Sequence, residues 1–95
     1  MSLKFEWDEQ KANANAGKHG VTFEEASTVF ADSLAAIFTD EEHSSEELRE
    51  ILIGHSARGR LLLVSFTERV GSVRIISVRQ ASRRERREYE QRPFG

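Results

Sequence analysis

Arginine is the residue type that gives the clearest indication of a chemical function in this chain, and its distribution is uneven. All 11 arginines lie after residue 48, whereas all 3 lysines precede it. A guanidinium can bind a phosphate through two parallel hydrogen bonds, which an ammonium group cannot do. The pattern predicts an anion-binding face, although arginines on a sheet and a helix can also serve only to keep them soluble. Nine of these 11 arginines are Arg58 and Arg60 in one expected turn, Arg69 in the next, Arg74 and Arg79 on the last expected strand, then Arg83, Arg84, Arg86 and Arg87.

Charge is also separated along the chain. Residues 1–48 carry 3 basic and 11 acidic side chains, a net of −8, and residues 49–95 carry 11 basic and 5 acidic side chains, a net of +6. The overall net charge of −2 hides this separation. A basic surface of this kind attracts a phosphate chain or an acidic protein segment.

Several groups are candidates for proton transfer or for contact with the phosphate. His43 lies among acidic residues and is a candidate proton donor, or else an ordinary solvated histidine. His19 ends a predicted helix, where a histidine commonly caps carbonyl groups. Arg49 opens a predicted strand, where it can anchor phosphate or pair with Glu46 or Glu47. Near the C-terminus, Glu85, Arg86 and Tyr89 are spaced so that they share one face of a predicted helix.

The two arginines of the last predicted strand are not equivalent. In a regular strand, Arg74 and Arg79 point to opposite faces, so both can serve one site only through a bulge or at a strand end. Arg79 lies at the strand end and is the better candidate for a phosphate contact. Arg74 can instead form a cross-strand salt bridge, for example with Glu68.

Other chemistries have little support in the sequence. There is no cysteine, and the 3 histidines lie in separate segments, so we expect no metal site and no cofactor. No serine stands in a glycine-flanked nucleophile elbow, and no phosphate-binding or dinucleotide glycine motif is present. The longest apolar run, 34–38, has 5 residues, whereas a membrane helix needs about 20. The N-terminus lacks the apolar region of a signal peptide, so we expect a cytoplasmic protein.

The elements that must position these residues form a single domain over 1–95. Alternation of apolar and polar residues predicts a short strand over 3–7, and capping residues predict helices from Asp8 to about residue 18 and from Thr22 to about residue 30. Strands are expected over 34–39, 50–55, 61–67 and 72–79, and a helix from Ser82 to about residue 91, followed by Pro93. The short loops make the last three strands an antiparallel meander. The fold class is therefore α+β, a twisted antiparallel sheet with its helices packed on one face.

An ordered set of residues extends along most of the chain. It consists of Trp7-Asp8, Lys11, Asn15, 18–21, 23–26, Val29-Phe30, His43, Glu47, Arg49, Gly54, Gly59-Arg60, 74–81, Glu85-Arg86 and Tyr89. This set resembles the BrnT toxin family, the ribonuclease half of type II toxin–antitoxin systems, over roughly residues 4 to 90. The resemblance implies a RelE-like fold with two N-terminal helices and a C-terminal helix.

The resemblance also implies an activity and a partner. Such toxins are metal-independent endoribonucleases that arrest growth, and a ribbon-helix-helix antitoxin of the BrnA type holds them inactive, with a possible dimer inside the complex. RNA supplies its own nucleophile, the 2′-OH, so the protein must align the attack, move protons and stabilise charge on phosphorus. We expect catalytic roles for Arg79, Arg49, His43, Glu85 and Tyr89, and RNA-binding roles for Arg74, Arg58, Arg60, Arg86, Lys18 and His19.

Two other functions remain open on the sequence alone. One is a non-catalytic nucleic-acid-binding module that uses the same arginines. The other is a protein-interaction domain that binds through an edge strand or through its acidic first half. Formation of RNA products separates the first from an enzyme, and salt-sensitive RNA binding separates the second from both.

Overall fold

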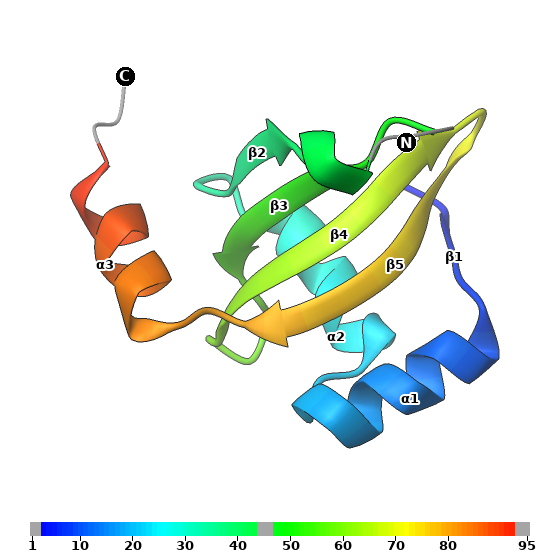
Figure 1. The fold of residues 1–95 in the computed structure, drawn as a ribbon, viewed down its shortest axis with the longest axis horizontal. Helices are drawn as coiled ribbons and strands as arrows, with labels where there is room; N and C mark the ends of the chain where they lie inside the picture. The colour runs from blue at the N-terminus through cyan, green and yellow to red at the C-terminus, as the bar shows by residue number, and fades with distance from the viewer. Residues whose placement is uncertain (1–2, 44–46, 93–95) are drawn as a thin grey trace.

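The chain folds into a five-stranded sheet with helices on both of its faces (Figure 1). A computed structural model describes residues 3–43 and 47–92. The predicted α+β class is confirmed, while Pro93 and Glu46, one predicted partner of Arg49, lie outside the described residues. The elements are β1 (Phe5–Glu6), α1 (Glu9–His19), α2 (Phe23–Thr28), the 3-10 turn η1 (Val29–Ala31), β2 (Ala36–Thr39), the 3-10 turn η2 (Glu41–His43), β3 (Glu50–His55), β4 (Leu61–Arg69), β5 (Ser72–Gln80) and α3 (Arg83–Gln91).

The sheet is mixed rather than wholly antiparallel. Its strand order is β1-β5-β4-β3-β2, and β2 to β5 form an antiparallel meander whose last three strands agree with the prediction. The short β1 runs parallel to β5, pairing Phe5 with Val73 and Glu6 with Arg74. Two helices separate β1 from β2, so no hairpin fixes the direction of β1, and it can join the sheet in parallel.

A β-bulge interrupts the pairing of β4 with β5. Ser65 of β4 pairs with Ser77 of β5, but the next residue, Phe66, pairs with Ile75. Ile76 is therefore an extra residue on β5. An extra residue of this kind shifts the alternation of side chains along the strand by one position.

The bulge places both arginines of β5 on the same face of the sheet. Val73, Ile75 and Val78 all belong to the main core, although regular alternation would put Val78 on the face opposite the other two. Arg74 and Arg79 consequently share the other face. The expectation that they point oppositely is wrong, because it assumed a regular strand.

The main core lies between the sheet and the first two helices. Its helical members are Ala12, Val21, Phe23, Ala26 and Val29, and its strand members are Leu52, Leu62, Val64, Phe66, Val73, Ile75 and Val78. We call the opposite side of the sheet the open face. Its side chains are Ala36, Phe38, Ile51, Ile53, Leu61, Leu63, Ser65, Arg74, Ser77 and Arg79.

The helix α3 packs at one end of the open face, away from α1 and α2 (Figure 1). Its Tyr89 is buried beside Ile53, Leu61 and Leu63, and the Tyr89 hydroxyl donates to the Leu34 carbonyl (3.0 Å). The expectation that all helices pack on one face is therefore wrong. Tyr89 is the buried residue of this otherwise charged helix, and its contacts hold α3 against the second face.

The first helix is fixed to the edge of β5 by a buried asparagine. The side chain of Asn15 accepts from the Val78 N–H (3.0 Å) and donates to the Val78 carbonyl (2.8 Å). Its amide also donates to the Val21 carbonyl (3.1 Å). Asn15 thus satisfies backbone groups of β5 as a neighbouring strand would, and it holds the C-terminal half of α1 against the sheet.

Helix ends follow the predicted caps, with one difference. Asp8 accepts from the Lys11 N–H and begins α1, and Thr22 accepts from the Glu25 N–H and begins α2. In a capping box the Glu25 side chain would accept from the Thr22 N–H in return, and this bond is absent from the described contacts of α2. That carboxylate instead accepts from the Ser56 hydroxyl and from the guanidinium of Arg60.

Candidate active site

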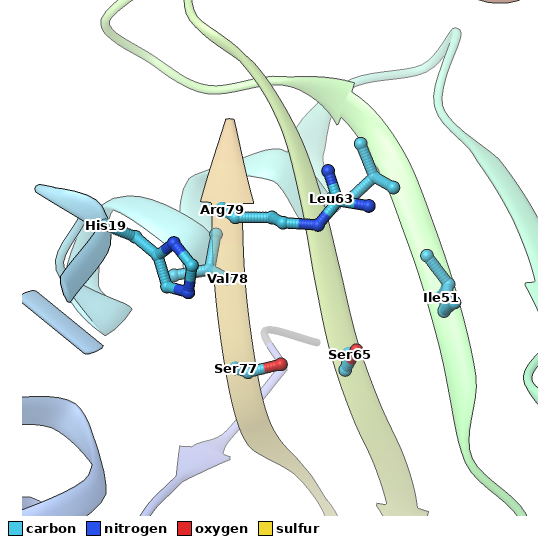
Figure 2. A pocket seen from close by; sticks show the side chains of 7 residues that line it. All are labelled: His19, Ile51, Leu63, Ser65, Ser77, Val78 and Arg79. Carbon is cyan, nitrogen blue, oxygen red and sulfur yellow. The ribbon is translucent and has the colours of Figure 1, made fainter. Parts of the chain in front are cut away.

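A small pocket lies where the end of α1 meets the open face beside β5. Its volume is about 90 Å³. Figure 2 shows the imidazole of His19 on one side of β5, while the Arg79 side chain reaches from β5 across β4 toward Leu63. We call this hollow the His19–Arg79 pocket. It is lined by His19, Ile51, Leu63, Ser65, Ser77, Val78 and Arg79.

The pocket combines groups that suit a phosphate ester. An imidazole can take or give a proton near neutral pH, and a guanidinium can bind a phosphate through two hydrogen bonds. The hydroxyls of Ser65 and Ser77, a directly paired couple across β4 and β5, can donate to phosphate oxygens. Groups of the kinds that bind a phosphodiester and that transfer a proton therefore line the same pocket.

His19 is held in position by the backbone around it. It is the last residue of α1, and the helix ends at Gly20, whose φ of 68° lies in the left-handed region that favours glycine. The Gly20 N–H donates to the Ala16 carbonyl (2.9 Å). Because Asn15 fastens the preceding turn to Val78, the imidazole is presented next to β5.

Arg79 is oriented by a two-pronged ion pair with Glu85. Its Nη1 donates to Oε1 of Glu85 (2.7 Å), and its Nη2 donates to Oε2 (2.8 Å). The Arg79 side chain remains 45% exposed, so solvent still reaches it. The pair holds the guanidinium over the open face and raises the pKa of Arg79.

Glu85 also begins α3. Its Oε1 accepts from the Ser82 N–H (2.8 Å), while the Ser82 hydroxyl accepts from the Glu85 N–H (3.1 Å), and the two bonds form a capping box. The hydrogen bonds from Arg79, assisted by the bond from Ser82, lower the pKa of Glu85 to about 2 against the opposing effect of burial. Glu85 is therefore ionised at neutral pH and is a weak base.

Arg74 stands further along the same face as Arg79. Its Nη1 lies 3.5 Å from Oε2 of Glu6, and the other oxygen of that carboxylate accepts from the Ser72 hydroxyl (3.0 Å). The salt bridge expected with Glu68 is thus formed with Glu6 of β1, because β1 is the neighbour of β5 at this position.

The structure does not bring His43, Arg49 and Tyr89 into the pocket. His43 lies in η2, with its side chain 60% exposed and its Nδ1 3.0 Å from Oδ2 of Asp40. Arg49 immediately precedes β3, and its carbonyl accepts from the Asp40 N–H (2.9 Å). Glu47, a predicted partner of Arg49, has its Oε1 3.2 Å from Nη2 of Arg69. Tyr89 is buried, and its hydroxyl donates a hydrogen bond to the Leu34 carbonyl.

Arg58 and Arg60 lie at the turn between β3 and β4, and Arg60 is committed to the fold. Its Nε donates to Oε2 of Glu25 (2.9 Å), its Nη2 donates to Oε1, and a further bond reaches the Gly20 carbonyl. Glu25 is buried, and these bonds lower its pKa despite the opposing effect of burial. Arg58 is mostly exposed and lies 3.8 Å from Glu25. Neither arginine lines the pocket.

The two remaining basic candidates, Lys18 and Arg86, do not line the pocket. Lys18 is exposed in the last turn of α1, next to His19. Arg86 lies on α3, with Nη1 3.9 Å from Oε2 of Glu90. Each is next in sequence to a residue at the pocket, since Lys18 precedes His19 and Arg86 follows Glu85, the partner of Arg79.

The roles of three residues in this region, Ser65, Ser77 and Asn15, are not evident from the sequence. Ser65 and Ser77 interrupt apolar strands, and a polar residue at such a position is a weak signal for a site. Asn15 stands between alanines on the buried side of α1, where a lone polar residue indicates a specific partner. The sequence does not reveal that the partner is Val78.

Among residues 3–43 and 47–92, no helix is long and apolar enough to cross a membrane. Within the same residues, no three His, Cys, Asp or Glu side chains gather in a way that could hold a metal ion.

Comparisons with known proteins identify the class of protein that this fold and pocket represent. The sequence profile described as the ribonuclease toxin, BrnT, of a type II toxin–antitoxin system matches residues 7–85. The chain therefore belongs to the BrnT family of ribonuclease toxins.

A solved structure agrees with the family assignment. The chain is similar to the ribonuclease toxin BrnT of Brucella abortus, known from a crystal structure at 1.1 Å resolution. The TM-score is 0.66 and the sequence identity is 26%, over 86% of this chain and 100% of the Brucella chain. A search of curated proteins found no match.

Proposed function

We propose that this chain is a toxin that cleaves RNA without a metal ion, through attack of the 2′-OH on the adjacent phosphate. The observation that carries the proposal is that His19 and Arg79 line one pocket of the open face. Membership of a ribonuclease toxin family supports the choice of RNA as substrate. The pocket supplies a base and a cation, which are the groups such a cleavage needs.

In the proposed reaction, Arg79 binds the non-bridging oxygens of the scissile phosphate, and Ser65 and Ser77 donate to the same group. His19 takes the proton of the 2′-OH as the 2′-oxygen bonds to phosphorus. The bond from phosphorus to the 5′-oxygen breaks, and the leaving oxygen takes up a proton from water. The products are a 2′,3′-cyclic phosphate and a 5′-hydroxyl end, and His19 returns its proton to solvent.

We assign Glu85 a positioning role rather than a part in proton transfer. Its low pKa makes it a poor base, and both of its oxygens contact the guanidinium of Arg79. It fixes the direction of Arg79 before substrate arrives, which reduces the entropy lost on binding.

The test is incubation of the purified chain with a defined RNA in excess chelator, with identification of the product ends. Cleavage that yields cyclic phosphate ends, and that Arg79→Ala abolishes, supports the proposal. Salt-sensitive binding without cleavage, both on free RNA and on translating ribosomes, would instead indicate a non-catalytic RNA-binding module.

We further propose that an antitoxin of the ribbon-helix-helix type, similar to BrnA, inhibits the chain by covering the open face, and that the complex contains two copies of the toxin. The basic second half of the chain suits an acidic segment of such a partner. Competition between RNA and antitoxin for the chain is the expected result. Simultaneous binding of both would contradict this mode of inhibition.

A further inference from the structure

Two rows of side chains cross the open face from β5 to β2. The first row contains Ser77, Ser65, Ile51 and Phe38, because each residue pairs with the next across adjacent strands. Neighbouring strands lie about 4.8 Å apart, so Phe38 stands roughly 14 Å from the polar end of its row. The second row contains Arg79, Leu63, Ile53 and Ala36.

Phe38 borders a second hollow on the open face, next to the His19–Arg79 pocket. This hollow has a volume of about 290 Å³, and we call it the Phe38 hollow. Leu63 lines both hollows, and the Arg79–Glu85 pair joins their rims. The Phe38 side chain belongs to the edge strand β2 and is 48% exposed. The lining residues are Ala36, Phe38, Ile53, Leu63, Glu85, Glu88, Tyr89 and Arg92.

The chemistry of the Phe38 hollow suits a flat, uncharged ring with N–H donors. Its floor is apolar and its wall carries an exposed aromatic ring, whereas the exposed carboxylate of Glu88 gives its rim negative charge that disfavours phosphate. Carboxylates accept hydrogen bonds from the amino groups of nucleobases. The positive group of the lining, Arg92, is already engaged, since it stacks 4.4 Å from the centre of the Tyr89 ring and donates to a backbone carbonyl.

One rim carboxylate is readily available to such a base. Glu88 is 66% exposed and is paired only with Arg84 of the same helix, at 3.0 Å, among the described residues. An exposed pair of this kind contributes little free energy and opens easily. Phosphate and base therefore find different surfaces on the open face, with phosphate toward β5 and base toward β2.

We propose that the Phe38 hollow binds one nucleobase of single-stranded RNA by stacking on Phe38, while a phosphate of the same RNA strand lies at Arg79. The inference rests on the proposed function for its choice of RNA, and it adds the form of the substrate. Exposed aromatic rings on a sheet stack the bases of single strands, whereas paired bases inside a duplex are not available for stacking. The hollow thus selects single-stranded over double-stranded RNA.

The test measures binding separately from cleavage. The probe is a short single-stranded oligonucleotide with 2′-O-methyl groups, which lacks the nucleophile, and its affinity is compared for the wild type, Phe38→Ala, Phe38→Leu and Phe38→Trp. Ile37→Ala is the matched control, because Ile37 is the next residue of β2, is 57% exposed and lies on the opposite face, paired with Leu52. Circular dichroism confirms that each variant is folded.

The expected result is a loss of affinity of about 5- to 150-fold in Phe38→Ala, the effect of one stacked base. We expect a similar loss in Phe38→Leu, near-normal binding in Phe38→Trp and no change in Ile37→Ala. Removing single bases from the probe should reproduce the loss at one position in the wild type and cause no further loss there in Phe38→Ala.

Three results would overturn the inference. The first is equal oligonucleotide affinity of Phe38→Ala and the wild type. The second is wild-type oligonucleotide affinity of Phe38→Leu. The third is a loss of antitoxin binding in Phe38→Ala without a loss of oligonucleotide binding, which would make the hollow a protein-docking site. Cleavage of unmodified RNA is measured in parallel. Binding that depends on Phe38, without any cleavage by the wild type on free RNA or on translating ribosomes, would contradict the proposed function but would still support the base site.

Discussion

The guanidinium of Arg79 and the carboxylate of Glu85 face each other through two contacts of 2.7 and 2.8 Å, and the same carboxylate caps α3. One side chain thereby connects the last strand, the last helix and the proposed phosphate site. The position of α3 and the direction of Arg79 are therefore coupled, and a change at Glu85 should affect both.

Glu85→Gln is expected to lower the free energy of unfolding at pH 7 by about 1–2 kcal/mol, since the variant loses the charge that pairs with Arg79. The pKa of Glu85 is lower in the folded chain, about 2, than its ordinary value of 4.5. Its contribution is therefore complete above about pH 4.5 and disappears as the pH falls through about 2. Urea unfolding of both proteins between pH 7 and pH 2 measures this, and a difference in stability that did not shrink on acidification would argue against the pair.

Asn15→Leu should destabilise the chain by roughly 2–4 kcal/mol, because the N–H and carbonyl of Val78 lose their partner. We also expect slower RNA cleavage at temperatures where the variant is still folded, since Asn15 holds the turn that presents His19. Thermal unfolding and single-turnover cleavage measure the two effects.

Asn13→Leu is the matched control, because Asn13 is exposed on the same helix. It should leave both quantities nearly unchanged. Equal behaviour of the two variants would show that the contact with Val78 does not position the active site.

Arg60→Ala should cost about 2–4 kcal/mol of stability, since it leaves the buried carboxylate of Glu25 without its main partner. Arg58→Ala, at the same turn, should cost less than about 0.5 kcal/mol, because Arg58 is 74% exposed. Chemical denaturation compares the two. A stable Arg60→Ala variant with weakened RNA binding would instead restore Arg60 as an RNA contact.

The helices and most strands could be predicted from the sequence, because their signals are local. Asp8, Thr22 and Ser82 mark helix starts through hydrogen bonds that span three residues, and Gly20 marks a helix end. The parallel pairing of β1, the bulge near Ile76 and the contact of Asn15 with Val78 depend on partners far along the chain. No local pattern encodes them.

The candidate site was predicted in part. Arg79 follows from its place at a strand end, and the structure puts it in a pocket. His43 was the preferred histidine because of its acidic neighbours, yet His19 is the histidine that lines the pocket with Arg79. That arrangement arises because α1 runs along the edge of β5, which the sequence does not reveal.

The most direct test of the central claim is a double-mutant cycle on RNA cleavage with His19→Ala, Arg79→Ala and both together, with His43→Ala as the control. We predict that each single variant loses at least about 100-fold in single-turnover rate, that the double variant is little worse than the poorer single one, and that His43→Ala retains the wild-type rate. The rate losses of the two single variants are not expected to add, because the two residues act in one site. Cleavage by folded His19→Ala at the wild-type rate, or a large loss in His43→Ala alone, would contradict the claim that His19 and Arg79 form the active site.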